Sequence, residues 1–243
     1  MAWRSSGTSN AELVENLHRN GMIKTDTVKA AFLKVDRAHY APSSPYNDSP
    51  QSIGHGATIS APHMHATAAE HLLTSLTAPP AEGASSGRRP PRRILDIGSG
   101  SGYLTHLLAE LAGAEEGTVV VGVEHIAALR DLGERNMSRS EEGRGLLASG
   151  RVRFRVGDGR KGWAEPGEEH AGWDAIHVGA SAVEVHDELI TQLRSPGRMF
   201  IPVDDEDGYG GQHIWAVDKD GEGNVTRKRL FGVRYVPLTD PPK

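Results

Sequence analysis

The sequence predicts an α/β fold in which a layer of helices precedes a doubly wound, mostly parallel sheet. Three observations predict it: helical periodicity before residue 77, short apolar strands alternating with helices from Ile94 onward, and a glycine-rich turn after the first of those strands. Repeated strand–helix units are typical of a parallel sheet with helices on both faces. We therefore expect a single domain over residues 1–243, with N-terminal helices over 1–76, a flexible loop over 77–93 and the sheet with the C-terminal strands over 94–243.

The helical layer is expected to hold three helices. The first begins at Ser9, which has the S-x-x-E spacing of a capping box with Glu12. Apolar residues at helical spacing predict a second helix over Thr25–Val35. Residues 38–60 are rich in proline, serine and glycine and are expected to be loop. The third helix is expected from Ser60 to Leu76, with a proline in its first turn.

The connection over 77–93 contains proline pairs, glycines and two arginine pairs, Arg88-Arg89 and Arg92-Arg93. Proline and glycine at this density are typical of a flexible connection. Basic pairs also occur in nuclear localisation signals. We favour solvated loop charge over a nuclear address.

The rest of the chain alternates strands and helices, without an internal repeat. The expected parallel strands are Ile94–Ile97, Val119–Val123, Arg151–Val156, Trp173–Val178 and Met199–Val203. The expected helices are Tyr103–Ala112, Ala127–Asn136 and Glu184–Leu193. A final antiparallel pair is expected at His213–Val217 and Leu230–Val236, and polar loops at Ser138–Gly150 and Asp204–Gly211.

Composition narrows the class of protein. A hydrophobic fraction of 37% and a charged fraction of 24% are those of a globular protein. The net charge of -5 gives no basic signal for nucleic acid, and the absence of cysteine excludes disulfides and zinc thiolate sites. No apolar run approaches the roughly 18 residues that span a bilayer. We expect a cytoplasmic protein without a nucleic-acid or membrane partner.

A glycine-rich turn follows the first strand of the sheet. Gly98, Gly100 and Gly102 are spaced G-x-G-x-G, and Tyr103 stands at the position where the dinucleotide fingerprint G-x-G-x-x-G has its third glycine. Ligands of such sheets bind beyond the carboxyl ends of the strands, where a helix begins. The turn therefore predicts a ligand site that is not a nicotinamide site, although a purely structural turn is an alternative.

Acidic residues end three successive strands. They are Asp96, Glu124 and Asp158. A pyrophosphate is disfavoured beside Asp96, whereas a sulfonium and an amino group are favoured, and a carboxylate at Glu124 can accept bonds from both hydroxyls of a ribose. Each acid taken alone has a second explanation as a helix cap. Together they indicate a nucleoside site for a positively charged cofactor, and the region resembles the class I S-adenosylmethionine-dependent methyltransferases.

The segment Gln51–Ala66, with the letters QSIGHGATISAPHMHA, indicates the acceptor. It closely resembles the signature of the protein-L-isoaspartate (D-aspartate) O-methyltransferases, as do Asp48–Pro50, Asp174–Ala180 and Tyr235–Asp240, and the eukaryotic members resemble it more than the bacterial ones. The resemblance implies methyl transfer from S-adenosylmethionine, with S-adenosylhomocysteine as product, to the free carboxylate of L-isoaspartyl or D-aspartyl residues in damaged proteins. The ester then closes to a succinimide, whose hydrolysis restores some aspartate. A monomer is the family expectation.

The resemblance also assigns site residues. Ser60 is the catalytic residue. The cofactor residues are Ala57, Thr58, Ile59, Ser60, His65, Asp96, Gly98, Gly100, Ser101, Gly102, Glu124, His125, Asp158, Gly159 and Thr239. The substrate residues are Ser60, His177, Val178, Gly179 and Ala180.

Ser60 suits its assigned role on physical grounds. A carboxylate with a pKa of about 4 is already ionised at neutral pH, so no general base is needed and alignment is the remaining task. The Ser60 hydroxyl can donate to that carboxylate beside a helix start. The alternative is that Ser60 only caps the helix.

Other readings remain open at this point. His55, His63, His65 and His71 lie close in sequence, but no nearby carboxylate completes a metal shell and the helical spacing separates His63 from His65, so we expect no metal. A methyltransferase of another acceptor, such as a small molecule or RNA, and a non-catalytic cofactor-binding protein are the alternatives to the isoaspartyl enzyme. A nicotinamide dehydrogenase is disfavoured by Tyr103 and Asp96.

Overall fold

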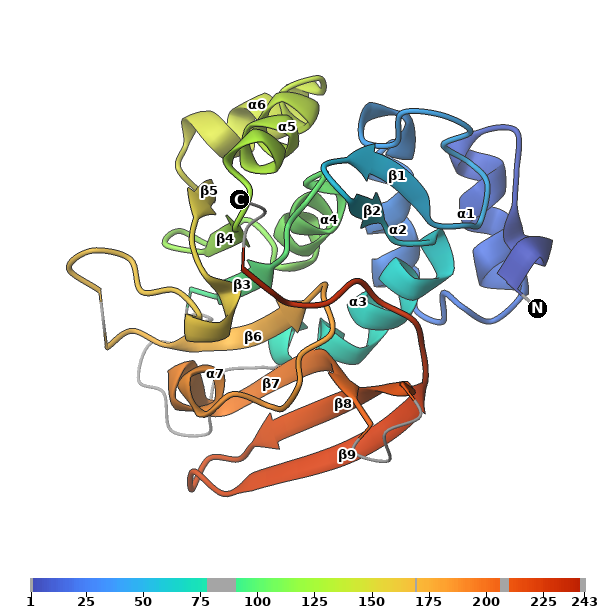
Figure 1. Ribbon diagram of the computed structural model, residues 1–243. Coiled ribbons are helices and arrows are strands. Elements are labelled where there is room, and N and C mark those ends of the chain that lie inside the picture. The colour runs from blue at the N-terminus through green and yellow to red at the C-terminus, as the bar shows by residue number, and fades with distance from the viewer. Residues whose placement is uncertain (1, 78–90, 169, 206–209, 241–243) are drawn as a thin grey trace.

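The computed structural model describes residues 2–77, 91–168, 170–205 and 210–240. Within these ranges a seven-stranded sheet has the order β5-β4-β3-β6-β7-β8-β9. Its strands are β3 (Arg93–Ile97), β4 (Val119–Glu124), β5 (Val152–Val156), β6 (Trp173–Val178), β7 (Leu193–Asp204), β8 (Gln212–Lys219) and β9 (Val225–Gly232). The strands from β5 to β7 are parallel, and β8 runs antiparallel to both β7 and β9 (Figure 1). The predicted fold class is confirmed.

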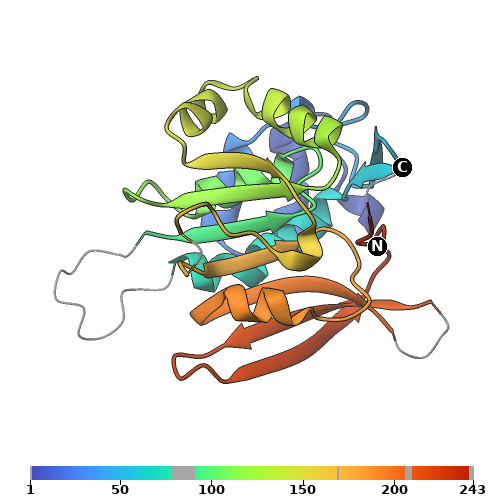
Figure 2. The same ribbon diagram turned by 60° about the vertical axis from the view of Figure 1, so that its left-hand side comes forward.

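The helices cover the two faces of the sheet unequally. They are α1 (Asn10–Arg19), α2 (Asp26–Lys34), α3 (Pro62–Thr77), α4 (Tyr103–Leu111), α5 (Ala127–Met137), α6 (Glu141–Ala148) and α7 (Asp187–Gln192). Residues from α1 to α6 share one apolar cluster on the first face, and α7 packs on the second face (Figure 2). Short 3-10 turns lie at η1 (Ala2–Ser5), η2 (Arg37–His39) and η3 (Gly159–Lys161).

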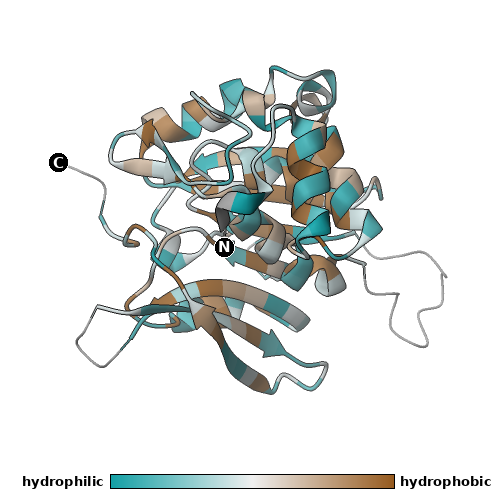
Figure 3. Ribbon diagram, turned by 90° about the vertical axis from the view of Figure 1, so that its right-hand side faces the viewer, coloured by the Kyte–Doolittle hydropathy of each residue, from teal (hydrophilic) through white to brown (hydrophobic). Residues whose placement is uncertain are grey.

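The alternation of side chains along each strand separates the two cores. Ile94 and Ala175 belong to the cluster on the first face, whereas their chain neighbours Leu95 and Ile176 belong to the cluster on the second. Because successive side chains of a strand point to opposite faces, a fully apolar strand must be covered on both sides. The central strands β3 and β6 are buried along their whole length, and Figure 3 shows mostly apolar colour in the strands that lie behind the helices.

The N-terminal helices begin where the sequence predicts. The Ser9 hydroxyl accepts a bond from the backbone N–H of Glu12 at 3.2 Å and so caps α1, while the Glu12 carboxylate accepts from Thr8. The Thr25 hydroxyl caps α2 in the same way. Leu13 and Leu17 of α1 are buried in the first-face cluster, where α1 contacts α2 and α3, and these two helices in turn contact α4. The predicted helical layer is confirmed.

The loop predicted over residues 38–60 is wrong in its second half. A hairpin forms there from β1 (Gln51–Gly54) and β2 (Ala57–Ile59). His55 and Gly56 at its tip both have positive φ, 52° and 73°, which matches the right-handed twist of a two-residue hairpin. The strands are short, and a histidine replaces the asparagine or aspartate that normally signals such a turn, so the pattern was missed.

The loop predicted at Ser138–Gly150 is also wrong, because α6 lies within it. The Ser140 hydroxyl accepts from the N–H of Gly143 at 3.0 Å, and Glu141 and Glu142 occupy the first turn. Acidic residues near a helix N-terminus are favourable. The helix was not predicted because it contains two glycines, which have low helix propensity. The packing of Leu146 in the apolar cluster on the first face stabilises it.

The last predicted strand is displaced toward the N-terminus. β9 covers Val225–Gly232 rather than Leu230–Val236, since pairing with β8 selects a basic, exposed stretch. The released residues 233–240 cross the carboxyl edge of the sheet instead (Figure 1). The predicted helix at Glu184–Leu193 is shorter, as α7, and β7 begins before Met199.

Most of the loop predicted at 77–93 lies outside the described residues, including Arg88-Arg89. Arg92 and Arg93 are described and are buried, so the prediction of solvated charge is wrong for them. The Asp174 carboxylate accepts from the backbone N–H of Arg93 at 2.7 Å, and the Arg93 guanidinium lies over the Trp173 ring. These contacts make Arg93 the start of β3. Within the described ranges, no helix combines the length and apolar character needed to cross a membrane.

Candidate active site

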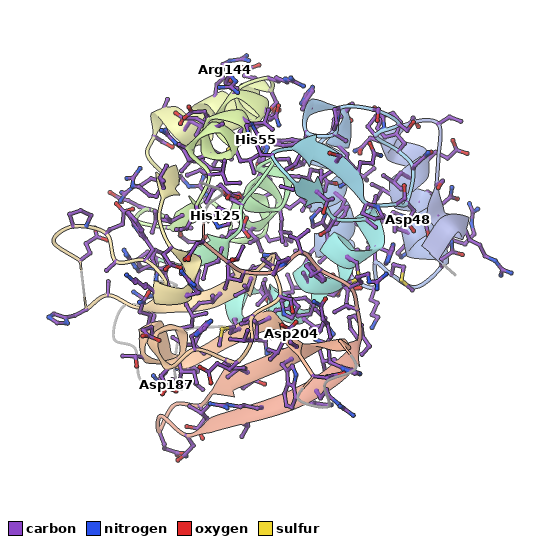
Figure 4. The ribbon with its side chains drawn as sticks, in the orientation of Figure 1. Asp48, His55, His125, Arg144, Asp187 and Asp204 are labelled. Carbon is purple, nitrogen blue, oxygen red and sulfur yellow. The ribbon has the colours of Figure 1, made fainter. Side chains whose placement is uncertain are left out.

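A cavity of about 380 Å³ lies beyond the carboxyl ends of β3, β4 and β6, and we call it the strand-end pocket. Its floor includes Gly98 and Gly100 of the glycine-rich turn, and its far wall includes Leu238 from the C-terminal segment. The hairpin closes another side with His55. Figure 4 shows His55 and His125 on this same side of the molecule, although one comes from the hairpin and the other follows β4.

The glycine-rich turn has a backbone that only glycine adopts readily. Gly102 precedes α4 at a φ of 83°, and a Cβ there would lie 2.9 Å from the carbonyl oxygen of Gly133. A side chain is therefore excluded both by strain and by the backbone of α5. Gly159 is restricted for a different reason, because its Cβ would collide with the side chain of Ile97. These glycines keep two backbone segments close to the pocket.

The Glu124 carboxylate organises the pocket from the end of β4. One oxygen accepts the N–H of Gly100 and the other accepts the N–H of Ile126, both at 3.1 Å. Glu124 is buried and lines the pocket, and its ionisable neighbour among the described residues is His125, whose Nε2 lies 4.0 Å from the carboxylate. A buried carboxylate with remaining lone pairs is a strong acceptor for ligand hydroxyl groups.

Asp96 supports the site from behind. Its two oxygens are taken by the Thr105 hydroxyl at 2.6 Å and by Nδ1 of His177 at 2.8 Å, and its side chain is almost completely buried. The His177 ring stacks on Phe200. This chain of contacts joins α4, β3, β6 and β7 beneath the turn. Asp96 is placed to hold the turn, and its contact with a cofactor stays a prediction.

Asp158 anchors the C-terminal segment to the rim of the pocket. It forms a two-pronged ion pair with Arg160, with nitrogen–oxygen distances of 2.9 and 2.8 Å, and Arg160 also pairs with Asp240. Hydrogen bonding from Arg160 lowers the pKa of the Asp158 carboxyl. Thr239, next to Asp240, lines the pocket. The ion pairs of Arg160 with Asp158 and Asp240 thus hold Thr239 at the pocket, although it is far from the glycine-rich turn in sequence.

A second cavity, of about 260 Å³, contains Ser60, and we call it the Ser60 pocket. It shares Thr58, Gly179 and Val236 with the strand-end pocket, so the two cavities adjoin. The backbone bonds between Ser181 and the segment Val236–Leu238 hold the C-terminal segment across this junction. Two ligands placed in these cavities would meet beside Thr58 and Gly179.

Asp48, and not Ser60, caps the N-terminus of α3. One oxygen of this buried carboxylate accepts the backbone N–H of His63 at 3.0 Å, in the first turn of α3, and also pairs with Nδ1 of the same residue at 2.7 Å. Figure 4 places Asp48 on the N-terminal side, near α1 and α3. With the helix start capped by Asp48, the Ser60 hydroxyl is available to the pocket.

Tyr235 is the nearest titratable partner of that hydroxyl. Burial raises the pKa of the Tyr235 phenol to about 12, against a smaller lowering from its hydrogen bond with the Ser60 side chain. The phenol therefore keeps its proton at neutral pH. Arg234 and His63 also line the Ser60 pocket, which gives the cavity several donors suited to an anion.

The structure brings most of the predicted site residues together. Those that line one or both cavities are Ala57, Thr58, Ser60, Gly98, Gly100, Glu124, His125, Gly159, Gly179, Ala180 and Thr239. The remaining predicted residues lie behind the lining, and their roles stay predictions: Ile59, His65, Asp96, Ser101, Gly102, Asp158, His177 and Val178.

Four apolar residues that line the strand-end pocket were not predicted from the sequence. Ile126 and Leu129 of the α5 start, together with Val236 and Leu238, form apolar lining of the strand-end pocket. The last two stand in the motif segment Tyr235–Asp240, from which only Thr239 was assigned. Position after a strand end was the available signal for Ile126, because loops at that edge border the ligand site. Among the described residues, no group of three or more candidate metal ligands occurs.

Comparisons with known proteins agree with this geometry. A family model described as Protein-L-isoaspartate(D-aspartate) O-methyltransferase (PCMT) matches residues 8–243. The chain is 44% identical to the protein-L-isoaspartate O-methyltransferase of Caenorhabditis elegans over 98% of this chain and 96% of that protein, and 43% identical to Protein-L-isoaspartate O-methyltransferase 1 of Arabidopsis thaliana over 97% and 93%.

A solved structure shows the same likeness in three dimensions. It is a putative protein-L-isoaspartate O-methyltransferase from Plasmodium falciparum in complex with S-adenosyl-L-homocysteine. The two chains are 33% identical, superpose with a TM-score of 0.81 and cover 96% and 99% of one another.

Proposed function

The chain belongs to the protein-L-isoaspartate(D-aspartate) O-methyltransferase family, and we propose that its two adjoining pockets hold the two reactants of that family's reaction. The enzyme transfers a methyl group from S-adenosylmethionine to the free carboxylate of L-isoaspartyl residues in damaged proteins, and so begins their repair through a succinimide. The strand-end pocket takes S-adenosylmethionine and the Ser60 pocket takes the acceptor. D-Aspartyl residues, whose side-chain carboxylate is free, are the second substrate that we propose.

The residues of the strand-end pocket fit S-adenosylmethionine. Gly98 and Gly100 leave the floor free of side chains, and the buried Glu124 carboxylate can accept both hydroxyls of a ribose. The apolar residues Ile126 and Leu129 suit the faces of an adenine ring. When bound, the cofactor supplies an electrophilic methyl group on a positively charged sulfur.

The chain's own residues then have two tasks, to bind the acceptor and to align it. The acceptor carboxylate is ionised at neutral pH, so no residue is needed to remove a proton from it. The Ser60 hydroxyl donates to one carboxylate oxygen and directs the other oxygen toward the junction at Thr58 and Gly179. Alignment of reacting atoms at roughly 3–3.5 Å supplies the main rate advantage in such transfers.

The observation that carries this proposal is the shared wall of the two pockets. Thr58, Gly179 and Val236 line both cavities, with Ser60 on one side and Glu124 on the other. A nucleoside cofactor held by Glu124 and a carboxylate held by Ser60 therefore approach one another without a rearrangement of the sheet. A cofactor-binding protein without activity has no need of the second cavity.

Paired peptides test the function. Labelled S-adenosylmethionine is offered with peptides that differ only in aspartate or isoaspartate at one position, and label is expected in the isoaspartyl peptide alone. A third peptide, whose isoaspartyl α-carboxylate is amidated, keeps the bent backbone but removes the acceptor and should stay unlabelled. Equal label in the first two peptides, or none in either, would overturn the proposal.

We also propose that residues 1–243 act as one domain and that the enzyme is a cytosolic monomer without a nucleic-acid partner. The shared core supports the first point, since the N-terminal helices and the sheet contribute to one apolar cluster. Sedimentation at micromolar concentration tests the monomer, and fractionation of cells tests the location. A stable dimer or recovery in a sedimenting organelle would contradict these two points without affecting the reaction.

A further inference from the structure

Arg37 is a fully buried arginine that lies behind the Ser60 pocket. It begins the turn η2, and its side chain is 0% exposed. One guanidinium nitrogen donates to the backbone carbonyl oxygen of Ser60 at 2.8 Å. A second lies 3.3 Å from Nδ1 of His65, and the guanidinium plane lies over the Tyr103 ring, 5.0 Å from its centroid. Arg37 thus touches the residue that precedes α3 by two positions.

The surroundings of Arg37 do not neutralise its charge by direct contact. Among the described residues no carboxylate forms an ion pair with it, and its Nε has no hydrogen-bond partner. Burial lowers the pKa of Arg37 to about 10, and Asp48 is the carboxylate whose charge opposes that lowering. Arg37 therefore still carries its proton at neutral pH, as an incompletely compensated buried cation.

His65 adds no second charge to this cluster. Burial lowers the pKa of His65 well below 6.5, and the Arg37 charge lowers it further. A neutral His65 accepts at Nδ1 from the guanidinium. The cluster of Arg37, His65 and Tyr103 carries one positive charge beside the pocket in which we place the acceptor anion.

A buried charge is a poor device for stability alone. Removing an ion from water is costly, and apolar residues of similar volume frequently stabilise such a position equally well or better. The cost is consistent with a role in function, in which the carbonyl of Ser60 must be held in one orientation. Arg37 holds the Ser60 carbonyl oxygen, and Asp48 fixes the start of the helix that follows by accepting the N–H of His63.

We propose that Arg37 is a positioning residue for the methyl transfer, which holds the Ser60 backbone so that the Ser60 hydroxyl meets the acceptor carboxylate in line with the cofactor. Its charge also favours the entry of that carboxylate. It acts through Ser60 and does not touch the strand-end pocket, whose lining excludes it. This inference rests on the proposed function and assigns a second layer to the acceptor site.

The test compares Arg37→Met and Arg37→Lys with the wild-type enzyme. Arg37→Met is expected to lower kcat/KM for an isoaspartyl peptide by about 10- to 100-fold, the loss that follows from one charged hydrogen bond. The dissociation constant of S-adenosylhomocysteine should stay within twofold. Arg37→Lys keeps the charge and one donor, so about half of the logarithmic loss should be recovered.

Arg139→Met is the matched control. Arg139 also donates to a backbone carbonyl, that of His39 in the same turn, at 2.8 Å, but its bond is exposed and away from both pockets. Its removal should leave kcat/KM within twofold. Thermal melting of every variant identifies a general loss of fold, and Arg37→Lys remains informative if Arg37→Met does not fold.

Two results would overturn the inference. One is unchanged kcat/KM in a folded Arg37→Met enzyme. The other is a parallel loss of S-adenosylhomocysteine affinity and turnover in both variants, which is the result of a purely structural role. Failure of the wild-type enzyme to distinguish aspartyl from isoaspartyl peptides would instead overturn the proposed function, so the two failures are separable.

Discussion

The strand-end pocket and the Ser60 pocket adjoin, yet they are assembled in different ways. The first is built mainly from the carboxyl ends of consecutive strands, with Gly98 and Gly100 after β3 and Glu124 as the last residue of β4. The second joins Ser60, from the start of the chain, to Tyr235 and Val236 near its end. On the proposed assignment, the sheet itself builds the cofactor site, whereas the acceptor site depends on segments that precede and follow the sheet in the chain.

The two pockets are expected to affect different measured quantities. Changes in the strand-end pocket should alter cofactor affinity, and changes in the Ser60 pocket should alter turnover at constant cofactor affinity. The shared residues Thr58, Gly179 and Val236 are the places where the division must fail, because they border both cavities.

Glu124→Gln should weaken binding of S-adenosylhomocysteine by about 100-fold, or about 2.7 kcal/mol. The amide loses the charged acceptor for ribose hydroxyls and presents an N–H group to the N–H of Gly100, which now donates to Glu124 at 3.1 Å. Calorimetric titration measures the change. Glu134→Gln is the control, because Glu134 is exposed on α5 and pairs with Arg130. A change below threefold in Glu124→Gln would remove this residue from the cofactor site.

Ser60→Ala should lower kcat for an isoaspartyl peptide by about 50-fold, or about 2.3 kcal/mol, with unchanged affinity for S-adenosylhomocysteine. Asp48 caps α3, so the fold should tolerate the loss of this hydroxyl. Steady-state kinetics and calorimetry on the same preparation provide both numbers. Ser149→Ala, at the end of α6, serves as a serine control outside both pockets. Equal losses of turnover and cofactor affinity would contradict the separation of the two pockets into an acceptor site and a cofactor site.

Gly102→Ala should lower the free energy of unfolding by about 2 kcal/mol, through its positive φ and the contact with the Gly133 carbonyl. The effect belongs to the strand-end pocket, so cofactor affinity should fall with it. Urea unfolding measures the stability change. Gly145→Ala provides the opposite control: a Cβ there meets nothing within 4 Å inside α6, and stability should rise by about 0.5–1 kcal/mol. A stable Gly102→Ala protein would show that the turn is less constrained than its geometry indicates.

The smallest expected effect is a change with pH in the free energy of unfolding. It comes from His65, which is buried behind the Ser60 pocket. The pKa of folded His65 lies well below 6.5, so as pH falls through 6.5 the unfolded chain takes up the proton first and stability is lost. At pH 5.5 this loss is on the order of 1 kcal/mol relative to neutral pH. Unfolding of wild-type and His65→Asn proteins between pH 7.5 and 5.5 should therefore give curves that converge in acid. Parallel curves would show that His65 titrates normally.

Local patterns were sufficient for much of the molecule. The cap at Ser9, the apolar strands and the turn from Gly98 to Gly102 depend on neighbours within a few residues, and each was predicted correctly. The errors occurred where local signals were weak or misleading. The hairpin turns at His55, and α6 contains two glycines, so packing against the rest of the chain decides both elements.

The sequence alone was sufficient to predict the α/β class, which the structure confirms. It also predicts a nucleoside site at the strand ends and, through its resemblance to a family, the role of Ser60. These follow from periodicity, glycine spacing and the charges at strand ends, which are short-range properties. Only the tertiary structure decided that Asp48 caps α3 in place of Ser60, that Arg37 holds the Ser60 carbonyl and that residues 233–240 close both pockets. These contacts join residues from 15 to more than 100 positions apart, and their partners are selected by shape and by the need to satisfy buried polar groups, which no local pattern encodes.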